Sequence, residues 1–217
     1  VSMANFLRSA ATAVRGEAPK LRTWVKEVKG AMSDLDIDPD FADQIIALGA
    51  PLEEMKAKVI GEAAEPIDGS RENCRARECT LVNLAADAQL DRMRDQGIQI
   101  SFQNGGGIRA SLDAGPITMG EVLTVFPFSN TLATMQITGA EVLQALENGV
   151  SQIEDGGGRF PQVAGLKFTF DKSKPAGSRV SDVEVDDGGT WAPLDPAKTY
   201  GVVTNNFVRN GGDGYAM

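Results

Sequence analysis

Two glycine-rich segments carry residues that could bind a ligand. Residues 104–109 read Asn-Gly-Gly-Gly-Ile-Arg. The three glycines allow a tight turn and a close approach of backbone to a ligand, and the planar guanidinium of Arg109 suits an oxyanion or hydroxyl groups. Residues 205–214 read Asn-Asn-Phe-Val-Arg-Asn-Gly-Gly-Asp-Gly and place an aromatic ring beside a glycine turn with a carboxylate. Taken alone, both segments are equally compatible with structural turns, the second with Asp213 in a left-handed conformation.

The two cysteines form a C-x4-C pair, Cys74 and Cys79, that encloses Arg75 and Arg77. Without a third Cys or any His, the pair cannot complete a four-ligand structural zinc site. It is therefore a local disulfide or two inert thiols, and the even count favours the disulfide. Such a bridge would fix the direction of the two arginines, and it would place the native protein outside the cytosol.

A fourth segment, residues 125–130, reads Val-Phe-Pro-Phe-Ser-Asn. Two aromatics around a proline, followed by small polar residues, are by themselves more typical of a core than of a ligand platform.

Composition excludes several kinds of chemistry. The 217 residues include no His, so this chain alone can build no Ser-His-Asp triad, Cys-His pair or His-containing zinc site. Hydrolysis would need carboxylates, Lys or residues from elsewhere. The net charge of −9 argues against nucleic-acid binding, which needs a clustered basic surface. We also expect no transmembrane segment, since no apolar run approaches the length of a bilayer span.

The pattern along the chain predicts the elements that hold these segments. Residues 1–30 carry six Lys or Arg and two Asp or Glu and show two helical apolar stripes, one from Phe6 to Val14 and one from Leu21 to Val28. A further helical run is expected from Phe41 to about Ile60, interrupted near Pro51.

Beyond residue 67, short strands and helices alternate. Helices are predicted from Thr80 to about Arg94, with Leu81, Leu84, Ala85, Ala88 and Met93 on one face, and after the capping boxes that begin at Thr118 and Thr138. Leu143, Leu146 and Val150 should form the buried face of the helix that starts at Thr138. Strands are predicted at 98–102, 132–138, 166–170, 180–185 and 200–204. The fold class is therefore α+β, with mixed α/β layers, short strands and hairpins.

Together the four segments resemble the C-terminal, substrate-binding domain of the 5′-nucleotidase and UDP-sugar hydrolase family. The motifs occur in the family's order at Arg75–Leu84 (R-x-x-E-C-x-x-x-N-L), Asn104–Arg109 (NGGGIR), Pro127–Phe128 (PF) and Asn206–Gly214 (NF-x-x-NGGDG). The resemblance runs from about residue 59 to 217. It implies an interdomain linker helix region at 36–66 and a substrate-binding domain at 67–217. Residues 1–35 match nothing in the family, so the helical arm of unknown role there rests on its apolar stripes alone.

The resemblance also implies a role for each candidate residue. A nucleotide base would lie between Phe128 and Phe207, with Asn130 at the base edge. Asp213 would accept hydrogen bonds from the ribose hydroxyls. The ribose and phosphate side would face Arg75, Asn104 and Arg109, and the loop glycines would be Gly105, Gly106, Gly107, Gly211 and Gly212.

The resemblance covers a part of the family's architecture. Family members hydrolyse phosphate esters with an N-terminal metallophosphoesterase domain that holds two divalent metal ions with His, Asp and Asn. This chain shows no His and no such motif, so we expect it to bind no metal or cofactor itself and to be inactive when isolated. The implied partners are a nucleotide or nucleoside and that N-terminal domain of the same polypeptide, and the implied location is periplasmic or extracellular. Two other classes stay open: a stand-alone nucleoside-binding module, and a structural interaction domain without catalysis.

Overall fold

The structure is a computed structural model and describes residues 49–217. Residues 49–57 are helical. The helices that follow are α4 (Arg71–Cys74), α5 (Thr80–Met93), α6 (Met119–Val125), α7 (Gly139–Gly149) and α8 (Asn206–Arg209). The strands are β1 (Val59–Ala63), β2 (Ile100–Asn104), β3 (Gly115–Thr118), β4 (Leu132–Thr138), β5 (Pro161–Ala164), β6 (Leu166–Phe170), β7 (Val180–Asp186), β8 (Trp191–Pro193) and β9 (Thr199–Asn205).

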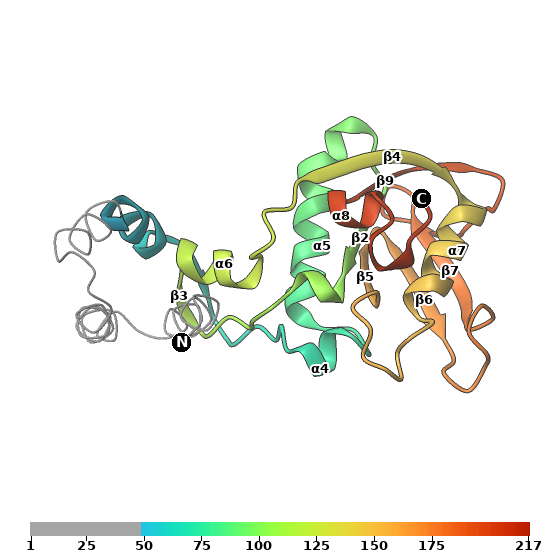
Figure 1. The fold of residues 1–217 in the computed structure, drawn as a ribbon. Helices are drawn as coiled ribbons and strands as arrows, with labels where there is room; N and C mark the ends of the chain where they lie inside the picture. Colours follow the sequence, from blue (N-terminus) through green and yellow to red (C-terminus); the bar gives the residue numbers. More distant parts are fainter. Residues whose placement is uncertain (1–48) are drawn as a thin grey trace. The chain divides into compact units, whose positions relative to one another are not determined.

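The candidate residues belong to one compact unit made of residues Val59–Ile117 and Glu121–Met217. Its central sheet has four strands in the order β4-β9-β2-β5 (Figure 1). The two inner strands, β2 and β9, are parallel, with Ile100 opposite Val202, and both outer strands pair antiparallel. Because parallel neighbours end at the same edge of a sheet, Asn104 and Asn205 come to lie at one edge.

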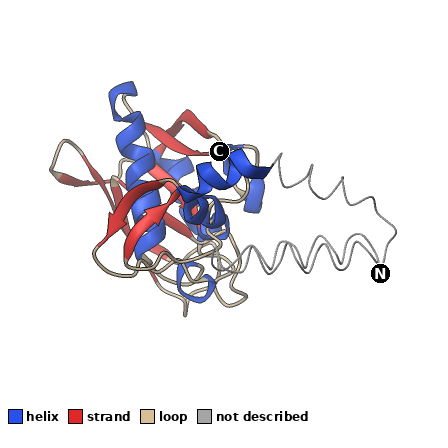
Figure 2. Ribbon diagram, turned by 90° about the vertical axis from the view of Figure 1, so that its left-hand side faces the viewer, coloured by secondary structure: helices blue, strands red, loops and turns tan. Residues whose placement is uncertain are grey.

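The inner strands are buried on both faces. On one face, α5 packs Ala86 and Leu90 against Ala164 and Val203. On the other face, alternate residues of the sheet, such as Phe102, join α7 and strands of a second sheet in the largest apolar cluster. That second sheet has the order β6-β7-β8. Figure 2 shows helices and strands interleaved, so the predicted α+β class with mixed layers is confirmed.

Two predicted helices, whose starts are marked by capping boxes in the sequence, are confirmed. Helix α7 begins with the predicted capping box, in which the Glu141 backbone N–H donates to Thr138 Oγ1 and the Thr138 backbone N–H donates to Glu141 Oε2. Its buried residues include Val142 and Ala145 as well as Leu146, while Leu143 is partly buried. Helix α6 begins directly after Thr118, as predicted.

The predicted buried face of α5 is partly wrong. Leu84 is 49% exposed and Ala88 is exposed, whereas Val82, Ala86 and Leu90 are buried. The reason is that α5 packs both on the sheet and on a second apolar cluster with Ile108 and Leu112. Those two contacts use neighbouring stripes of the helix and leave the stripe with Leu84 and Ala88 outside.

The helix predicted to reach Ile60 ends earlier. Residues 49–57 are helical through Pro51, and β1 begins at Val59, where two β-branched residues favour a strand. The predicted helical stripes between Phe6 and Val28 and the start of the run at Phe41 lie outside the described residues. Within residues 49–217, no helix is long and apolar enough to cross a membrane.

Candidate functional site

The two asparagines that end the parallel strands are in direct contact. Asn205 Nδ2 donates to Asn104 Oδ1 at 2.9 Å, and Asn104 Nδ2 donates to Asp213 Oδ2 at 2.7 Å. Both asparagines are buried. Ligands in open sheets with parallel strands typically bind beyond the carboxyl ends of those strands. The contacts therefore fix the Asp213 carboxylate at the edge where a ligand is expected.

The loop that carries Asp213 has a constrained backbone. Asp213 has φ +56°, in the left-handed region, between the positive-φ residues Gly211 and Gly214. The left-handed Asp expected of this turn is thus confirmed. Asn148 Nδ2 donates to the Asp213 carbonyl at 3.3 Å.

A buried tyrosine anchors the far side of the same loop. The Tyr215 hydroxyl donates to the Arg159 carbonyl at 2.6 Å, and burial raises the pKa of Tyr215 above its ordinary value. The hydroxyl therefore stays protonated and remains a donor, which holds the loop to the segment before β5.

The first glycine segment forms a single 3-10 turn over Gly105–Gly107. Its glycines let three backbone segments approach one another. A Cβ on Gly105 would overlap the Cys74 carbonyl, and a Cβ on Gly106 would lie 2.9 Å from the Gly158 Cα atom. The Gly106 backbone N–H donates to the Gly158 carbonyl at 2.8 Å. At these two positions the close approach is to protein backbone.

Phe128 and Phe207 are surface residues. Their exposed fractions are 54% and 44%, so the core role that spacing alone favoured for the residue 125–130 segment is wrong for Phe128. The Arg109 guanidinium lies 5.5 Å from the centre of the Phe128 ring, a cation–π contact. The Phe207 ring covers Gly212, where any Cβ would overlap it.

Two reciprocal hydrogen bonds tie the Phe128 loop to the helix that carries Phe207. The Thr131 backbone N–H donates to Asn206 Oδ1, and the Asn206 backbone N–H donates to the Thr131 carbonyl, both at 2.9 Å. The two rings therefore belong to segments that are fixed to each other.

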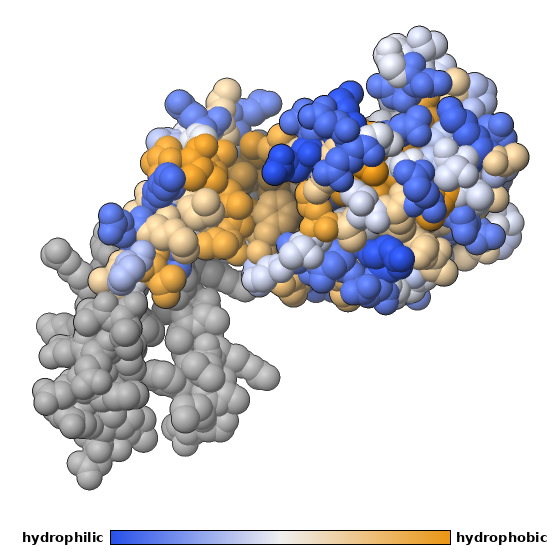
Figure 3. All heavy atoms as spheres, turned by 90° about the horizontal axis from the view of Figure 1, so that it is seen from above, coloured by the Kyte–Doolittle hydropathy of each residue, from blue (hydrophilic) through white to orange (hydrophobic). Residues whose placement is uncertain are grey.

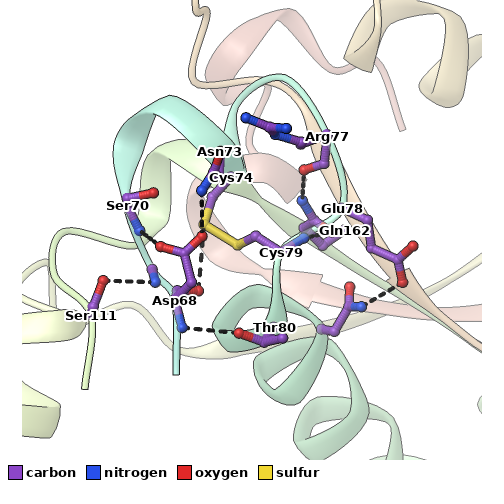
Figure 4. The surroundings of a disulfide bond; sticks show 12 residues. Asp68, Ser70, Asn73, Cys74, Arg77, Glu78, Cys79, Thr80, Ser111 and Gln162 are labelled. Carbon is purple, nitrogen blue, oxygen red and sulfur yellow. Dashed lines mark hydrogen bonds between the residues drawn. A yellow bond between two sulfur atoms is a disulfide. The ribbon is translucent and has the colours of Figure 1, made fainter. Parts of the chain in front are cut away.

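The predicted disulfide between Cys74 and Cys79 is confirmed (Figure 4). The segment before it is held by Asp68, whose carboxylate accepts from the Ser70 backbone N–H and from Asn73 Nδ2. These hydrogen bonds, the backbone one first, lower the pKa of Asp68 below its ordinary value. After the bridge, Gln162 on β5 accepts from the Cys79 backbone N–H. Both ends of the bridged loop are thus attached to the fold.

Arg75, inside that loop, is buried and charged. One guanidinium nitrogen donates to the Gly156 carbonyl at 3.3 Å, while the buried Nε has no hydrogen-bond partner. Burial lowers the pKa of Arg75, with the charges of Arg71 and Arg109 adding to the effect and Asp213 opposing it. Arg75 therefore shares an electrostatic environment with Arg109 and Asp213, although no direct ion pair joins it to Asp213 among the described contacts.

Asn130 is exposed and lines a surface groove together with Phe128. The groove has a volume of 660 Å³ and is lined mainly by apolar side chains of α5 and of residues 122–132, with Gln103 and Asn205 on its polar side. Figure 3 shows hydrophobic residues gathered around a hollow in the surface. Among the described residues, no hydrogen bond joins Asn130 to Asn104, Arg75 or Asp213, so its placement near a ligand stays a prediction.

Sequence reasoning missed three positioning residues: Asn148, Asn205 and Asn206. A weak signal was present for Asn205, since an Asn at a strand end before a short helix is typical of an N-cap. Asn206 opens the NF-x-x-NGGDG motif, but the motif gives it no role, and Asn148 carries no motif signal; the partners of both side chains, Thr131 and Asp213, lie far away in the chain.

In residues 49–217, no group of three or more His, Cys, Asp or Glu side chains could hold a metal ion, and both cysteines are in the disulfide. The donor sets needed for two divalent ions therefore do not fit this part of the chain.

The family model described as 5′-nucleotidase, C-terminal domain matches residues 59–217. The chain therefore belongs to the 5′-nucleotidase family and corresponds to its C-terminal domain, as the motifs predicted.

Known proteins agree with this assignment. The trifunctional nucleotide phosphoesterase protein YfkN of Bacillus subtilis is 41% identical over 89% of this chain, which spans 14% of YfkN. The snake venom 5′-nucleotidase of Crotalus adamanteus is 33% identical over 85% of the chain, which spans 34% of it. The crystal structure of a 5′-nucleotidase precursor from Thermus thermophilus is similar, with a TM-score of 0.76 and 50% identity, over 82% of this chain and 35% of that one. The chain thus spans about a third or less of the length of these relatives.

Proposed function

We propose that this chain is the nucleotide-binding domain of a phosphoester hydrolase of the 5′-nucleotidase family. The base would stack between Phe128 and Phe207, with Asn130 at its edge, and Asp213 would accept hydrogen bonds from the ribose hydroxyls. Arg75, Asn104 and Arg109 would face the ribose and phosphate. Stacking between rings tolerates different bases, and a carboxylate is a suitable acceptor for a cis-diol.

One observation carries this proposal above all. Two half-exposed aromatic rings lie on segments that are hydrogen-bonded to each other, and the second ring covers the glycine that precedes a fixed carboxylate. A core residue gains its stability from burial, whereas a ring that stacks on a ligand must keep a face free. The exposure of 54% and 44% fits the second role.

Catalysis would belong to a metallophosphoesterase domain of the same polypeptide. Such a domain would supply two divalent metal ions, while this chain would orient the nucleotide toward it. The names of the relatives favour nucleotide catabolism as the biological role. Whether the substrate is a nucleoside monophosphate, a nucleotide sugar or a cyclic nucleotide would depend partly on that domain.

Two observations support a periplasmic or extracellular location. The disulfide is stable in an oxidising compartment, and one relative is a venom protein.

The experiment is a calorimetric titration of the purified chain with adenosine and with AMP, paired with thermal melts. Saturable binding at one site with a raised melting temperature supports the proposal. If neither compound binds and the melt is unchanged, binding of adenine nucleosides and nucleotides is contradicted, and a structural interaction domain is favoured. The gene sequence upstream of residue 1 separates the remaining two classes: a metallophosphoesterase domain there indicates a hydrolase, and its absence indicates a stand-alone binding module.

A further inference from the structure

Asn205 has the contacts of a residue that orients the site without touching a ligand. It is 3% exposed and ends β9, and it precedes α8, the helix that carries Phe207. Its side chain makes three hydrogen bonds, of which the longest, from Nδ2 to Gln103 Oε1, is 3.4 Å. Oδ1 accepts from the Val208 backbone N–H at 3.0 Å, which caps α8, and Nδ2 donates to Asn104 Oδ1 at 2.9 Å.

These contacts form a series of hydrogen bonds that runs from the Val208 backbone through Asn205 and Asn104 to Asp213. The groups at the two ends of the series fix the direction of each bond in it. At one end, the Val208 backbone N–H is a donor only, so the Asn205 side chain must present its oxygen to it. The nitrogen of Asn205 must then face Asn104, and the Asn104 oxygen accepts. At the other end, the ionised carboxylate of Asp213 is an acceptor only, which matches the remaining nitrogen of Asn104. The amide orientations therefore follow from chemistry and not from an arbitrary assignment.

Gln103 links this series of hydrogen bonds to Gln89 on α5. Gln103 Nε2 donates to the Asn104 carbonyl at 3.0 Å, and Gln103 Oε1 accepts from Gln89 Nε2 at 2.6 Å. Gly107 leaves the space that this glutamine occupies, because a Cβ there would overlap Gln103 Nε2. A buried network whose members are all satisfied is rigid, so a change at one member alters the others.

We propose that Asn205 is a positioning residue that couples the Phe207 helix to the Asp213 carboxylate. By capping α8 it places the ring, and through Asn104 it presents a donor to Asp213 Oδ2. The Asn205 side chain therefore fixes both the helix that carries the Phe207 ring and the Asp213 carboxylate that would bind the hydroxyls. The inference rests on the proposed function for its ligand, although the orientation of Asn104 can be tested without one.

Asn205→Asp separates the two tasks of this side chain. Asp is as good an N-cap as Asn, so α8 keeps its cap. The carboxylate has no donor for Asn104 Oδ1, however, and the Asn104 amide then lies between two carboxylates with a nitrogen on one edge only. If the amide turns, Asn104 Nδ2 pairs with the new carboxylate, Oδ1 faces Asp213, and the pairing with Asp213 is lost. If it does not turn, Oδ1 faces the new carboxylate with Gln103 Nε2, at 3.3 Å, as its remaining donor, and the repulsion weakens the pairing.

The test is the crystal structure of Asn205→Asp together with titrations of adenosine and 2′,3′-dideoxyadenosine. We expect a folded protein in which Asn104 Nδ2 no longer donates to Asp213. Adenosine affinity should fall about tenfold, as for one charge-assisted hydrogen bond. Dideoxyadenosine affinity should stay unchanged, because its binding does not use Asp213. Asn205→Leu fills a similar volume but removes the hydrogen bonds to Val208 and Asn104, so it should weaken the binding of both ligands.

Thr138→Ala is the matched control, because it removes the cap of α7, far from the site in sequence, and should lower stability without changing either affinity. An intact contact between Asn104 and Asp213 in Asn205→Asp, or an equal loss for both ligands, would overturn the inference. If the wild-type chain binds neither nucleoside, it is the proposed function that fails, and the crystal structure of the variant still decides the role of Asn205.

Discussion

Asn104 Nδ2 lies 2.7 Å from Asp213 Oδ2, although the two residues are 109 positions apart. The contact joins the end of an inner strand to a glycine-rich turn near the end of the described chain. Asn104 is buried and Asp213 is partly exposed, and the hydrogen bond fixes one carboxylate oxygen; under the proposed function the other oxygen would accept from the ribose hydroxyls.

Asp213→Asn should therefore weaken the binding of ribonucleosides more than the binding of analogues that lack the ribose hydroxyls. The amide is a poorer acceptor for ribose hydroxyls, and its NH₂ group competes with that of Asn104. The loss should be roughly 1–3 kcal/mol for adenosine and much smaller for 2′,3′-dideoxyadenosine, whose hydroxyls are already missing. Titration of both compounds measures the difference. Equal losses for the two ligands would show that Asp213 does not bind the hydroxyls.

The disulfide gives a prediction about redox state. Intact mass should rise by two hydrogens on reduction, and protein never exposed to reductant should resist alkylation. The bridge closes a short loop, so opening it should lower the free energy of unfolding by about 2 kcal/mol. Freely alkylatable thiols in native protein would contradict both the bond and the proposed compartment.

Stability should fall in acid. Hydrogen bonds lower the pKa values of Asp68, Glu141, Glu154 and Asp171, so each binds a proton less readily in the folded than in the unfolded chain. Their stabilisation is present above the unfolded pKa of about 4 and is lost as the pH falls through the lower folded value. Chemical unfolding of wild type should show a decline below about pH 4. Asp68→Asn should make the decline shallower, while Asp87→Asn, on the exposed side of α5, should leave it unchanged.

The isolated chain should hydrolyse neither AMP nor a chromogenic phosphate ester when Mn²⁺, Zn²⁺ or Co²⁺ is supplied. The chain has no His, and residues 49–217 hold no cluster of metal-ligating side chains. A mock purification is the control for contaminating phosphatase. Turnover that depends on metal and follows the purified chain would show that catalytic residues lie within it.

The sequence predicted elements that carry local signals, such as the Thr138 capping box of α7 and the alternation of apolar and polar residues in β6. It failed for the face of α5, because helical spacing does not show that two neighbouring stripes are covered by different clusters. The candidate site was located through the family's motifs. Its supporting contacts were not predicted, because Asn205, Asn206 and Asn148 meet partners that are distant in sequence, and nothing in local spacing identifies those pairs.

The most direct test of the proposed nucleotide site is a comparison of Phe128→Ala, Phe207→Ala and Phe102→Ala by thermal melts and adenosine titration. Phe102 is 1% exposed and serves as the core control. We expect Phe102→Ala to lose about 3–5 kcal/mol of stability, as a buried ring does. Phe128→Ala and Phe207→Ala should lose much less stability, and each should weaken adenosine binding by roughly 1–3 kcal/mol. A large fall in melting temperature in these two variants, with unchanged affinity for adenosine, would contradict the proposed site and show that both rings are structural.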